Sequence, residues 1–267
     1  MSANTNGTQT LSEYQRRWNR FALSLLIVLG VICVASYYVR LFDGPRLAEG
    51  IPSIYNLLRE MLPPNFSEAQ NWLRPVIDTL AMSVAGTALA VLFSLPLAFL
   101  AARNTSPHPA VYQLARGILN GLRSVPELIM GIIFVAAVGF GALPGVLALG
   151  VHSIGMVGKF FAEAIEHAHS APVEAARAAG HTPLQVIFHG ILPQVIPQMA
   201  DVSIYRWEYN FRASTVMGMV GAGGIGFELM GALRLMRYRE LSAILIVVLL
   251  IVTWVGSLSG YLRRQFK

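Results

Sequence analysis

Several ionisable side chains fall within otherwise apolar stretches of the sequence, and those that could pair or bind there include Arg123, Glu127, Arg206, Glu208 and Arg212. A charge at the centre of a bilayer costs at least ~2.5 kcal/mol, so such residues are normally retained for pairing or for function. Arg123 and Glu127 are four residues apart, as are Glu208 and Arg212. Each couple is therefore predicted to form an intramembrane ion pair along one helix face.

Arg206 has no carboxylate three or four residues away. A guanidinium presents paired donors that match a tetrahedral oxyanion, and a small anion that sheds its water needs a partner in a low-dielectric path. Arg206 is therefore the first candidate for binding an anion. The alternative is a structural role, in which Arg206 reaches a lipid headgroup or a carbonyl group of another helix.

Motifs for other chemistry are missing from the sequence. Gly158-Lys159 is followed by Phe160 and lacks the upstream glycine of a P-loop, so we predict no ATP site of this kind. The six histidines include no H-E-x-x-H, and His167 and His169 lack further ligands nearby. We predict no catalytic residue, no metal site and no bound cofactor.

Residues 171–193 form a compact, fairly polar segment between two long apolar ones. The pattern predicts two short helices joined by a tight turn. Gly180 can adopt the left-handed conformation that ends the first helix. Thr182 begins the second through a Thr-x-x-Gln capping box, and Gly190 and Pro193 are expected to end it.

Residues 218–226, GMVGAGGIG, are too rich in glycine for a stable lipid-facing helix, because each Gly costs ~1 kcal/mol relative to Ala. Irregular backbone at membrane depth is tolerated only where protein or a water-filled path covers it. The segment is expected either to let helices cross closely or to form a bend that lines a path, where backbone donors can touch oxyanions.

Both segments resemble parts of the permease subunits of ABC importers. Glu174-Ala175-Ala176, followed by Gly180 and Leu192-Pro193, resembles the EAA loop, and Gly190 stands where the family pattern has Ile. In that family the loop is cytoplasmic and docks in a cleft of the ATPase subunit. Residues 212–226 resemble the corresponding segment of permeases for phosphonate and related phosphorus oxyanions. The likeness extends over the surrounding apolar segments and is weakest before about Trp72.

The resemblance implies roles for two sets of residues. The residues expected to couple to an ATPase are Glu174, Ala175, Ala176, Gly180, Leu192 and Pro193. The residues expected to line or gate the substrate path are Arg206, Arg212, Ser214, Thr215, Gly221, Gly223, Gly224 and Gly226. The implied partners are two ATP-binding subunits, a second permease copy and a periplasmic phosphonate- or phosphite-binding protein. ATP hydrolysis would belong to the partner, so the chain itself is not expected to be an enzyme.

Composition predicts an all-α, multispanning membrane protein, since 55% of the 267 residues are hydrophobic and 13% are charged, against roughly 25% charged in soluble domains. About six spans are expected, in the type I ABC importer permease fold that the resemblance implies: residues 21–39, 79–102, 111–138, 146–165, 195–217 and 241–262. The net charge of +6 does not indicate nucleic acid, because the basic residues are scattered between apolar blocks.

Three regions are expected along the chain. Residues 1–20 form a cytoplasmic tail, disordered or interfacial; residues 21–71 hold the first span and a periplasmic or interfacial segment; residues 72–267 form the permease core with the loop at 171–193. Six spans place both termini on one side. That side carries more Lys and Arg than the other, which favours the cytoplasm, in a protein of the bacterial inner membrane.

Several alternatives stay open. The substrate is phosphonate, phosphite, hypophosphite or another small anionic solute, and the permease pair is a homodimer or a heterodimer. An ATP-independent secondary transporter or channel would need no loop that matches an ATPase dock. An intramembrane enzyme would need a nucleophile–base pair or a metal motif, neither of which the sequence contains.

Overall fold

The computed structural model describes the backbone of residues 5–266 and the side chains of residues 14–266, and these residues are helical throughout, joined by short turns. The chain divides into two compact units, one that ends at Arg59 and one that begins at Glu60. The predicted regions 1–20, 21–71 and 72–267 stay a prediction. The all-helical class agrees with the prediction.

The first unit consists of α1 (Thr5–Tyr38) and most of α2 (Gly44–Glu60). The part of α1 from Tyr14 to Tyr38 is long and apolar enough to cross a membrane, with a mean hydropathy of 2.3 over its best window. Helix α1 already begins at Thr5, because extending an existing helix adds one hydrogen bond for each residue that is fixed. Residues 5–20 belong to this helix, residues 1–4 lie outside the described part, and the disordered or interfacial character of the tail stays a prediction.

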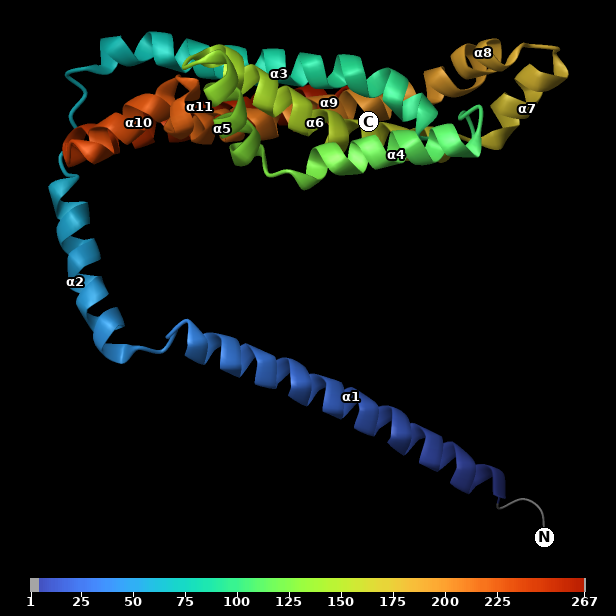
Figure 1. Ribbon diagram of the computed structural model, residues 1–267, viewed down its shortest axis with the longest axis horizontal. Coiled ribbons are helices and arrows are strands. Elements are labelled where there is room, and N and C mark those ends of the chain that lie inside the picture. Colours follow the sequence, from blue (N-terminus) through green and yellow to red (C-terminus); the bar gives the residue numbers. More distant parts are fainter. Residues whose placement is uncertain (1–4, 267) are drawn as a thin grey trace. The chain divides into compact units, whose positions relative to one another are not determined.

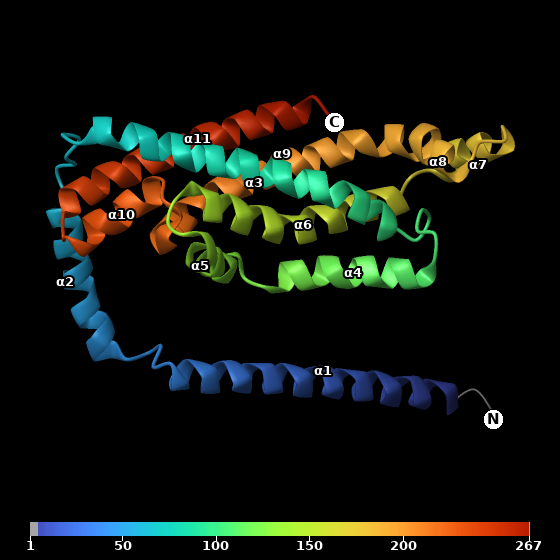
Figure 2. The ribbon, with the colours of Figure 1, turned by 45° about the horizontal axis from the view of Figure 1, so that its top comes forward.

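The second unit is a helical bundle (Figure 1). Its elements are η1 (Ala69–Trp72), α3 (Leu73–Leu100), α4 (Pro109–Ser124), α5 (Glu127–Val138), α6 (Ala142–Glu166), α7 (Ser170–Ala178), α8 (Pro183–Val186), η2 (Ile187–Ile191), α9 (Leu192–Met217), η3 (Gly218–Ala222), α10 (Ile225–Arg234) and α11 (Tyr238–Arg264). Helices α7 and α8 lie at one end of this bundle and α10 at the other, in both views (Figure 2).

Helix α6 is the centre of the bundle and packs against α3, α4, α5 and α9. In its most apolar window 61% of the residues are buried, against 33% for α3 and 28% for α11. Small residues allow this close packing. A Cβ atom at Gly155 would lie 2.6 Å from the carbonyl oxygen of Leu119, and one at Gly158 would lie 2.5 Å from a methyl group of the same leucine.

The predicted third span, residues 111–138, is not one helix. Helix α4 ends at Ser124, α5 begins at Glu127, and the two are bent by 85°. Pro126 causes the break, because its ring disfavours a helical conformation at the preceding residue, and Val125 is extended with φ −82° and ψ 122°. By length and composition, four helices among the described residues can span a membrane, or up to six if each of two bent pairs is one span.

The second bent pair contains the glycine-rich segment. Residues 218–222 form a wide π-helical turn, η3, and the chain bends by 59° before α10. Gly221, Gly223 and Gly224 have φ values of +105°, +76° and +71°, which only glycine adopts readily. The first amide of α10, Ile225 N–H, donates to Thr79 Oγ1 at 2.9 Å. The prediction of irregular backbone in this segment is confirmed.

Gly226 allows α10 to lie directly on α9, and this contact generates a prediction. A Cβ atom at Gly226 would lie 1.8 Å from the carbonyl oxygen of Thr215. Gly226→Ala is therefore expected to destabilise the fold by about 1–3 kcal/mol or more and to lower the unfolding temperature of the detergent-solubilised protein. Gly231→Ala, in the same helix with no atom within 4 Å, is the control and should leave that temperature unchanged or slightly higher. Equal stability of the two variants would contradict the packing.

Candidate functional site

The segment at residues 171–193, hereafter the elbow, has the turn that its sequence predicts. Helix α7 ends at Ala178, and Gly180 has φ +82°. Gly180 N–H donates to the carbonyl oxygen of Arg177 at 3.0 Å, and His181 N–H donates to that of Ala176 at 3.2 Å. These two bonds satisfy carbonyl groups that the end of a helix leaves free.

The second half of the elbow begins as predicted and ends differently. Thr182 N–H donates to Gln185 Oε1 at 2.8 Å, and Gln185 N–H donates to Thr182 Oγ1 at 3.4 Å, which completes the capping box. The helix does not stop at Gly190 and Pro193, however, but continues through η2 into α9. Pro193 lies in the first turn of α9, where its missing N–H is tolerated. A Cβ atom at Gly190 would lie 3.2 Å from Val173 Cα, so glycine lets η2 pack on α7.

The predicted coupling residues do not all face outward. Glu174, Ala175, Gly180 and Pro193 are exposed, whereas Leu192 is half-buried and Ala176 is buried. Ala176 therefore packs within the elbow. The surface that a partner could contact is formed by Glu174, Ala175 and the Gly180 turn.

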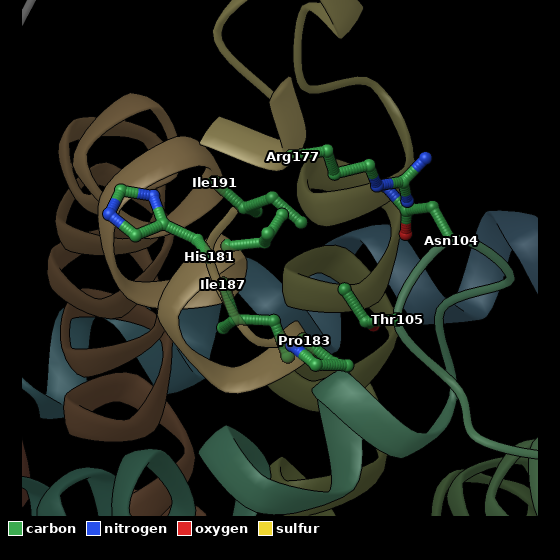
Figure 3. Close-up of a pocket in the computed structure, with 8 residues that line it drawn as sticks. Asn104, Thr105, Arg177, His181, Pro183, Ile187 and Ile191 are labelled. Carbon is green, nitrogen blue, oxygen red and sulfur yellow. The ribbon is translucent and has the colours of Figure 1, made fainter. Parts of the chain in front are cut away.

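A cavity of about 180 Å³ lies beside the elbow, between it and the turn that joins α3 to α4 (Figure 3). Arg177 and Asn104 lie together at one side of the cavity, and Ile187 and Ile191 form its apolar wall. Asn104 Nδ2 donates to the carbonyl oxygen of Ile165 at 2.7 Å, so this turn is attached to the end of α6. Arg177 could not be singled out from the sequence, because nothing in its type or spacing distinguishes it from other exposed arginines.

Glu166, the last residue of α6, connects the base of the elbow to the α3–α4 turn. Its Oε1 atom accepts from Arg103 N–H at 2.9 Å and from Arg116 Nη2 at 3.0 Å, and Arg116 Nε also donates to the carbonyl oxygen of Ala101 at 2.9 Å. A hydrogen bond to Tyr112 Oη raises the pKa of Arg103 above its ordinary value, so Arg103 stays charged. These contacts join residues far apart in the chain, which is why sequence reasoning missed them.

Arg206 is buried in the bundle, with 5% of its surface exposed. Its Nε atom donates to Ser153 Oγ of α6 at 2.9 Å, and its Cζ atom lies 4.3 Å from the centroid of the Tyr209 ring. Its Nη2 atom is buried and has no hydrogen-bond partner among the described residues. The guanidinium is thus held on one side and leaves one donor free.

A chain of hydrogen bonds extends from Arg206 across three helices. Ser153 Oγ donates to Asn210 Oδ1 at 3.1 Å, and Asn210 Nδ2 donates to Thr87 Oγ1 of α3 at 2.9 Å. All three side chains are buried. They are uncharged and distant in sequence, so no pattern pointed to them. Together with Arg206, Tyr209, Glu127 and His152 they make up what we call the buried polar cluster.

The predicted ion pair between Arg123 and Glu127 is not formed. The prediction required one continuous helix, and the break at Pro126 places Arg123 on α4, exposed, and Glu127 at the start of α5. Glu127 instead joins the cluster: its Oε1 atom accepts from Tyr209 Oη at 3.2 Å, and its Oε2 atom lies 4.0 Å from His152 Nε2.

The remaining predicted path residues lie apart from Arg206. Arg212 forms the predicted pair with Glu208, with Nη2 and Oε1 3.0 Å apart, and is half-exposed. Ser214 Oγ donates to the carbonyl oxygen of Phe211 at 2.7 Å, whereas Thr215 Oγ1 is buried with no partner in the described residues. Gly221, Gly223, Gly224 and Gly226 form the bend before α10. No hydrogen bond or ion pair among the described residues joins Arg212 to the cluster.

Comparison with known proteins identifies the class. Residues 94–266 match the family described as binding-protein-dependent transport system inner membrane component. The chain belongs to this family and is a multi-pass protein of the inner membrane. Its fold is that of a type I ABC importer permease: it superposes on a chain of the inward-facing MetNI methionine ABC transporter with a TM-score of 0.67 and 20% identity, over 76% of this chain and 99% of that one.

Two curated relatives are more specific. The chain is 68% identical over 250 residues, 94% of its length and 91% of the relative's, to the phosphite transport system permease protein PtxC of Stutzerimonas stutzeri. It is 44% identical over 223 residues, 84% of its length and 42% of the relative's, to the phosphate-import permease protein PhnE of Mycolicibacterium smegmatis. The resemblance inferred from the two sequence motifs is thereby confirmed.

The bond between Arg206 and Ser153 gives a stability prediction. Ser153→Ala leaves the buried Nε atom of Arg206 without an acceptor, which is expected to cost about 1–3 kcal/mol and to lower the unfolding temperature of the solubilised protein. Ser257→Ala removes a hydroxyl that is exposed on α11 and bonds only within its own helix; this control should not shift the temperature. An unchanged Ser153→Ala protein would show that the bond does not hold Arg206.

Proposed function

We propose that this chain is the membrane permease of an ATP-driven importer for phosphite or a similar small phosphorus oxyanion. The observation that carries the proposal is the 68% identity, over 94% of the chain, to a phosphite transport permease. The chain is the transmembrane subunit and not an enzyme, and separate subunits hydrolyse ATP. Phosphate is the second candidate substrate, favoured by the 44% identity to a phosphate-import permease.

The elbow is the dock for an ATP-binding subunit. Its outer surface offers Glu174 and small side chains around the Gly180 turn, which let a partner approach the backbone closely. The complete importer contains two permease copies, two ATP-binding subunits and a periplasmic binding protein, with both termini of the permease in the cytoplasm. The bonds of Glu166 to the α3–α4 turn support a mechanical role, since they tie the base of the elbow to two further helices.

Transport proceeds by alternating access. ATP closes the dimer of ATP-binding subunits, the elbows move, and the membrane helices change the side on which the path is open. Helix α9 is suited to transmit this movement, because it continues from the elbow through Arg206 to the glycine bend without interruption. The bend at Gly221, Gly223 and Gly224 acts as the gate.

Arg206 is the contact for the oxyanion in the path. Its buried Nη2 donor has no partner in the described residues, and a charged donor of this kind stabilises an anion that has shed its water. Arg206 must also bind the anion weakly enough for the anion to be released. Arg212 has a weaker claim, because Glu208 already neutralises it.

Reconstitution tests the function and the role of Arg206 together. In proteoliposomes with the ATP-binding subunits and the binding protein, the importer should take up phosphite only with ATP. Arg206→Ala should reduce uptake by about 10- to 100-fold, as expected for loss of a bond to a charged group, while the ATP-binding subunits still co-purify. Arg206→Lys should be intermediate.

The control is Arg234→Ala, which removes an exposed arginine from α10 and should transport at the parental rate. Uptake without ATP would contradict the proposed function, and uptake of phosphate but not phosphite would make phosphate, the second candidate, the substrate. Parental transport by Arg206→Ala would make Arg206 a structural anchor.

The Gly180 turn gives a prediction for coupling. A Cβ atom at Gly180 would meet no atom within 4 Å, so substitutions act there through backbone conformation alone. Gly180→Val should uncouple ATP hydrolysis from uptake, because a β-branched residue enters the left-handed region only at a cost of roughly 1–2 kcal/mol. Gly180→Asn is the matched control and should keep most of the coupling, since Asn tolerates that region. Equal coupling in both variants would argue against the elbow as the dock.

A further inference from the structure

Two buried atoms of the polar cluster lack hydrogen-bond partners in the described part of the chain, and they are of opposite kinds. Arg206 Nη2 is a donor, and Glu127 Oε2 is an acceptor. They come from different helices, α9 and α5, but share a neighbour in Tyr209. The Tyr209 ring lies 4.3 Å from Arg206 Cζ, and its hydroxyl group donates to the other oxygen of Glu127 at 3.2 Å.

His152 does not donate a hydrogen bond to Glu127 Oε2. Its Nδ1 atom lies 3.1 Å from the carbonyl oxygen of Val125, and a carbonyl can only accept, so Nδ1 carries a proton. In the neutral imidazole, Nε2 is then an acceptor that faces another acceptor. Even in the charged imidazolium, the 4.0 Å between Nε2 and Glu127 Oε2 exceeds hydrogen-bond length. The donor that Oε2 needs must therefore come from outside this group of side chains.

The other polar groups of the cluster are already engaged. Ser153 accepts from Arg206 and donates to Asn210, and Asn210 donates to Thr87. A buried polar group left unpaired costs about 1–3 kcal/mol, and a charged one costs more. A ligand that brings both an acceptor and a donor would remove two such penalties at once.

We propose that the cluster is a subsite for a tetrahedral oxyanion that still carries a hydroxyl proton. An anionic oxygen of the ligand accepts from Arg206 Nη2, and the P–OH group donates to Glu127 Oε2. This inference rests on the proposed function and adds a basis for selectivity. Phosphorus oxyanions carry such a proton in their monoanionic form, which is the minor form near neutral pH because the second ionisation lies at a pKa of about 6 in phosphate esters. Binding should therefore weaken as the pH rises above that value.

Sulfate has the same shape but no proton at neutral pH. It would place a negatively charged oxygen against the Glu127 carboxylate, so the subsite rejects it by charge repulsion and by the unmet acceptor. A carboxylate repels anions, so its presence beside Arg206 in an anion path needs an explanation. Glu127 is explained if its Oε2 atom accepts a hydrogen bond from the ligand's hydroxyl group.

The cluster is accessible from the Glu127 side. The side chains of Glu127 and His152 are 23% and 13% exposed, whereas Arg206 as a whole is 5% exposed. Glu127 Oε2 is itself buried, so a ligand must pass the partly exposed Glu127 and His152 side chains before it reaches Oε2 and the guanidinium.

Equilibrium binding to the complete complex, without the binding protein, tests this inference directly. The permease with its ATP-binding subunits is dialysed against labelled phosphite, with unlabelled phosphate, methylphosphonate or sulfate as competitors. The parental complex should release phosphite to the first two and not to sulfate. Glu127→Gln removes the charged acceptor of the P–OH hydrogen bond, so phosphite affinity should fall at least about 10-fold. It also removes the charge that repels sulfate, so sulfate should compete as well as phosphate.

Glu163→Gln is the matched control. Glu163 is on α6, where it pairs with Lys159 at the surface, and its removal should leave both affinity and selectivity at parental values. If Glu127→Gln keeps the parental preference for phosphite over sulfate, Glu127 does not select for the protonated ligand and the inference is wrong.

The result with Arg206→Ala separates this failure from others. If that variant loses phosphite binding while Glu127→Gln keeps its selectivity, only the inference about Glu127 fails. If the parental complex imports phosphite but does not bind it in dialysis, the subsite fails and the import function stands. If it neither binds nor imports phosphite, the proposed function itself fails.

Discussion

Burial of the Arg206 guanidinium within an apolar bundle is the constraint on which the rest of the core depends. A buried charge is tolerated only where polar groups surround it. Ser153 on α6 accepts from Arg206, and the bond continues through Asn210 to Thr87 on α3. These contacts fix the relative register of α3, α6 and α9, the three helices that form the centre of the bundle.

Helix α9 connects this constraint to both ends of the core. At one end it continues directly from the elbow, since Pro193 falls in its first turn and does not stop the helix. At the other end it passes through a π-helical turn into the glycine bend. A displacement of the elbow therefore reaches Arg206 without crossing a flexible loop. Glu166 adds a second connection, from the base of the elbow to the α3–α4 turn.

The sequence predicted those features that depend on neighbouring residues. The Thr182 capping box and the left-handed Gly180 could be predicted because each follows from a few adjacent side chains and backbone sterics. The glycine bend was predicted for the same reason. The Glu208–Arg212 pair was found as well, because both residues lie on one unbroken helix.

Features that depend on packing between distant segments could not be predicted in this way. The predicted ion pair between Arg123 and Glu127 is not formed, because the helix that would have carried both residues ends before Pro126. Ser153 and Asn210 are uncharged, and only the fold brings them to Arg206.

The central claim is that the oxyanion lies between Arg206 and Glu127 during transport. The most direct measurement is an electron cryomicroscopy structure of the complete importer, trapped in an occluded state with phosphite. The account predicts density for the oxyanion within hydrogen-bond distance of Arg206 Nη2 and Glu127 Oε2, the two buried atoms of the polar cluster that lack hydrogen-bond partners in the described residues. Occupation of both atoms by side chains of the second permease copy, with phosphite bound elsewhere, would contradict it.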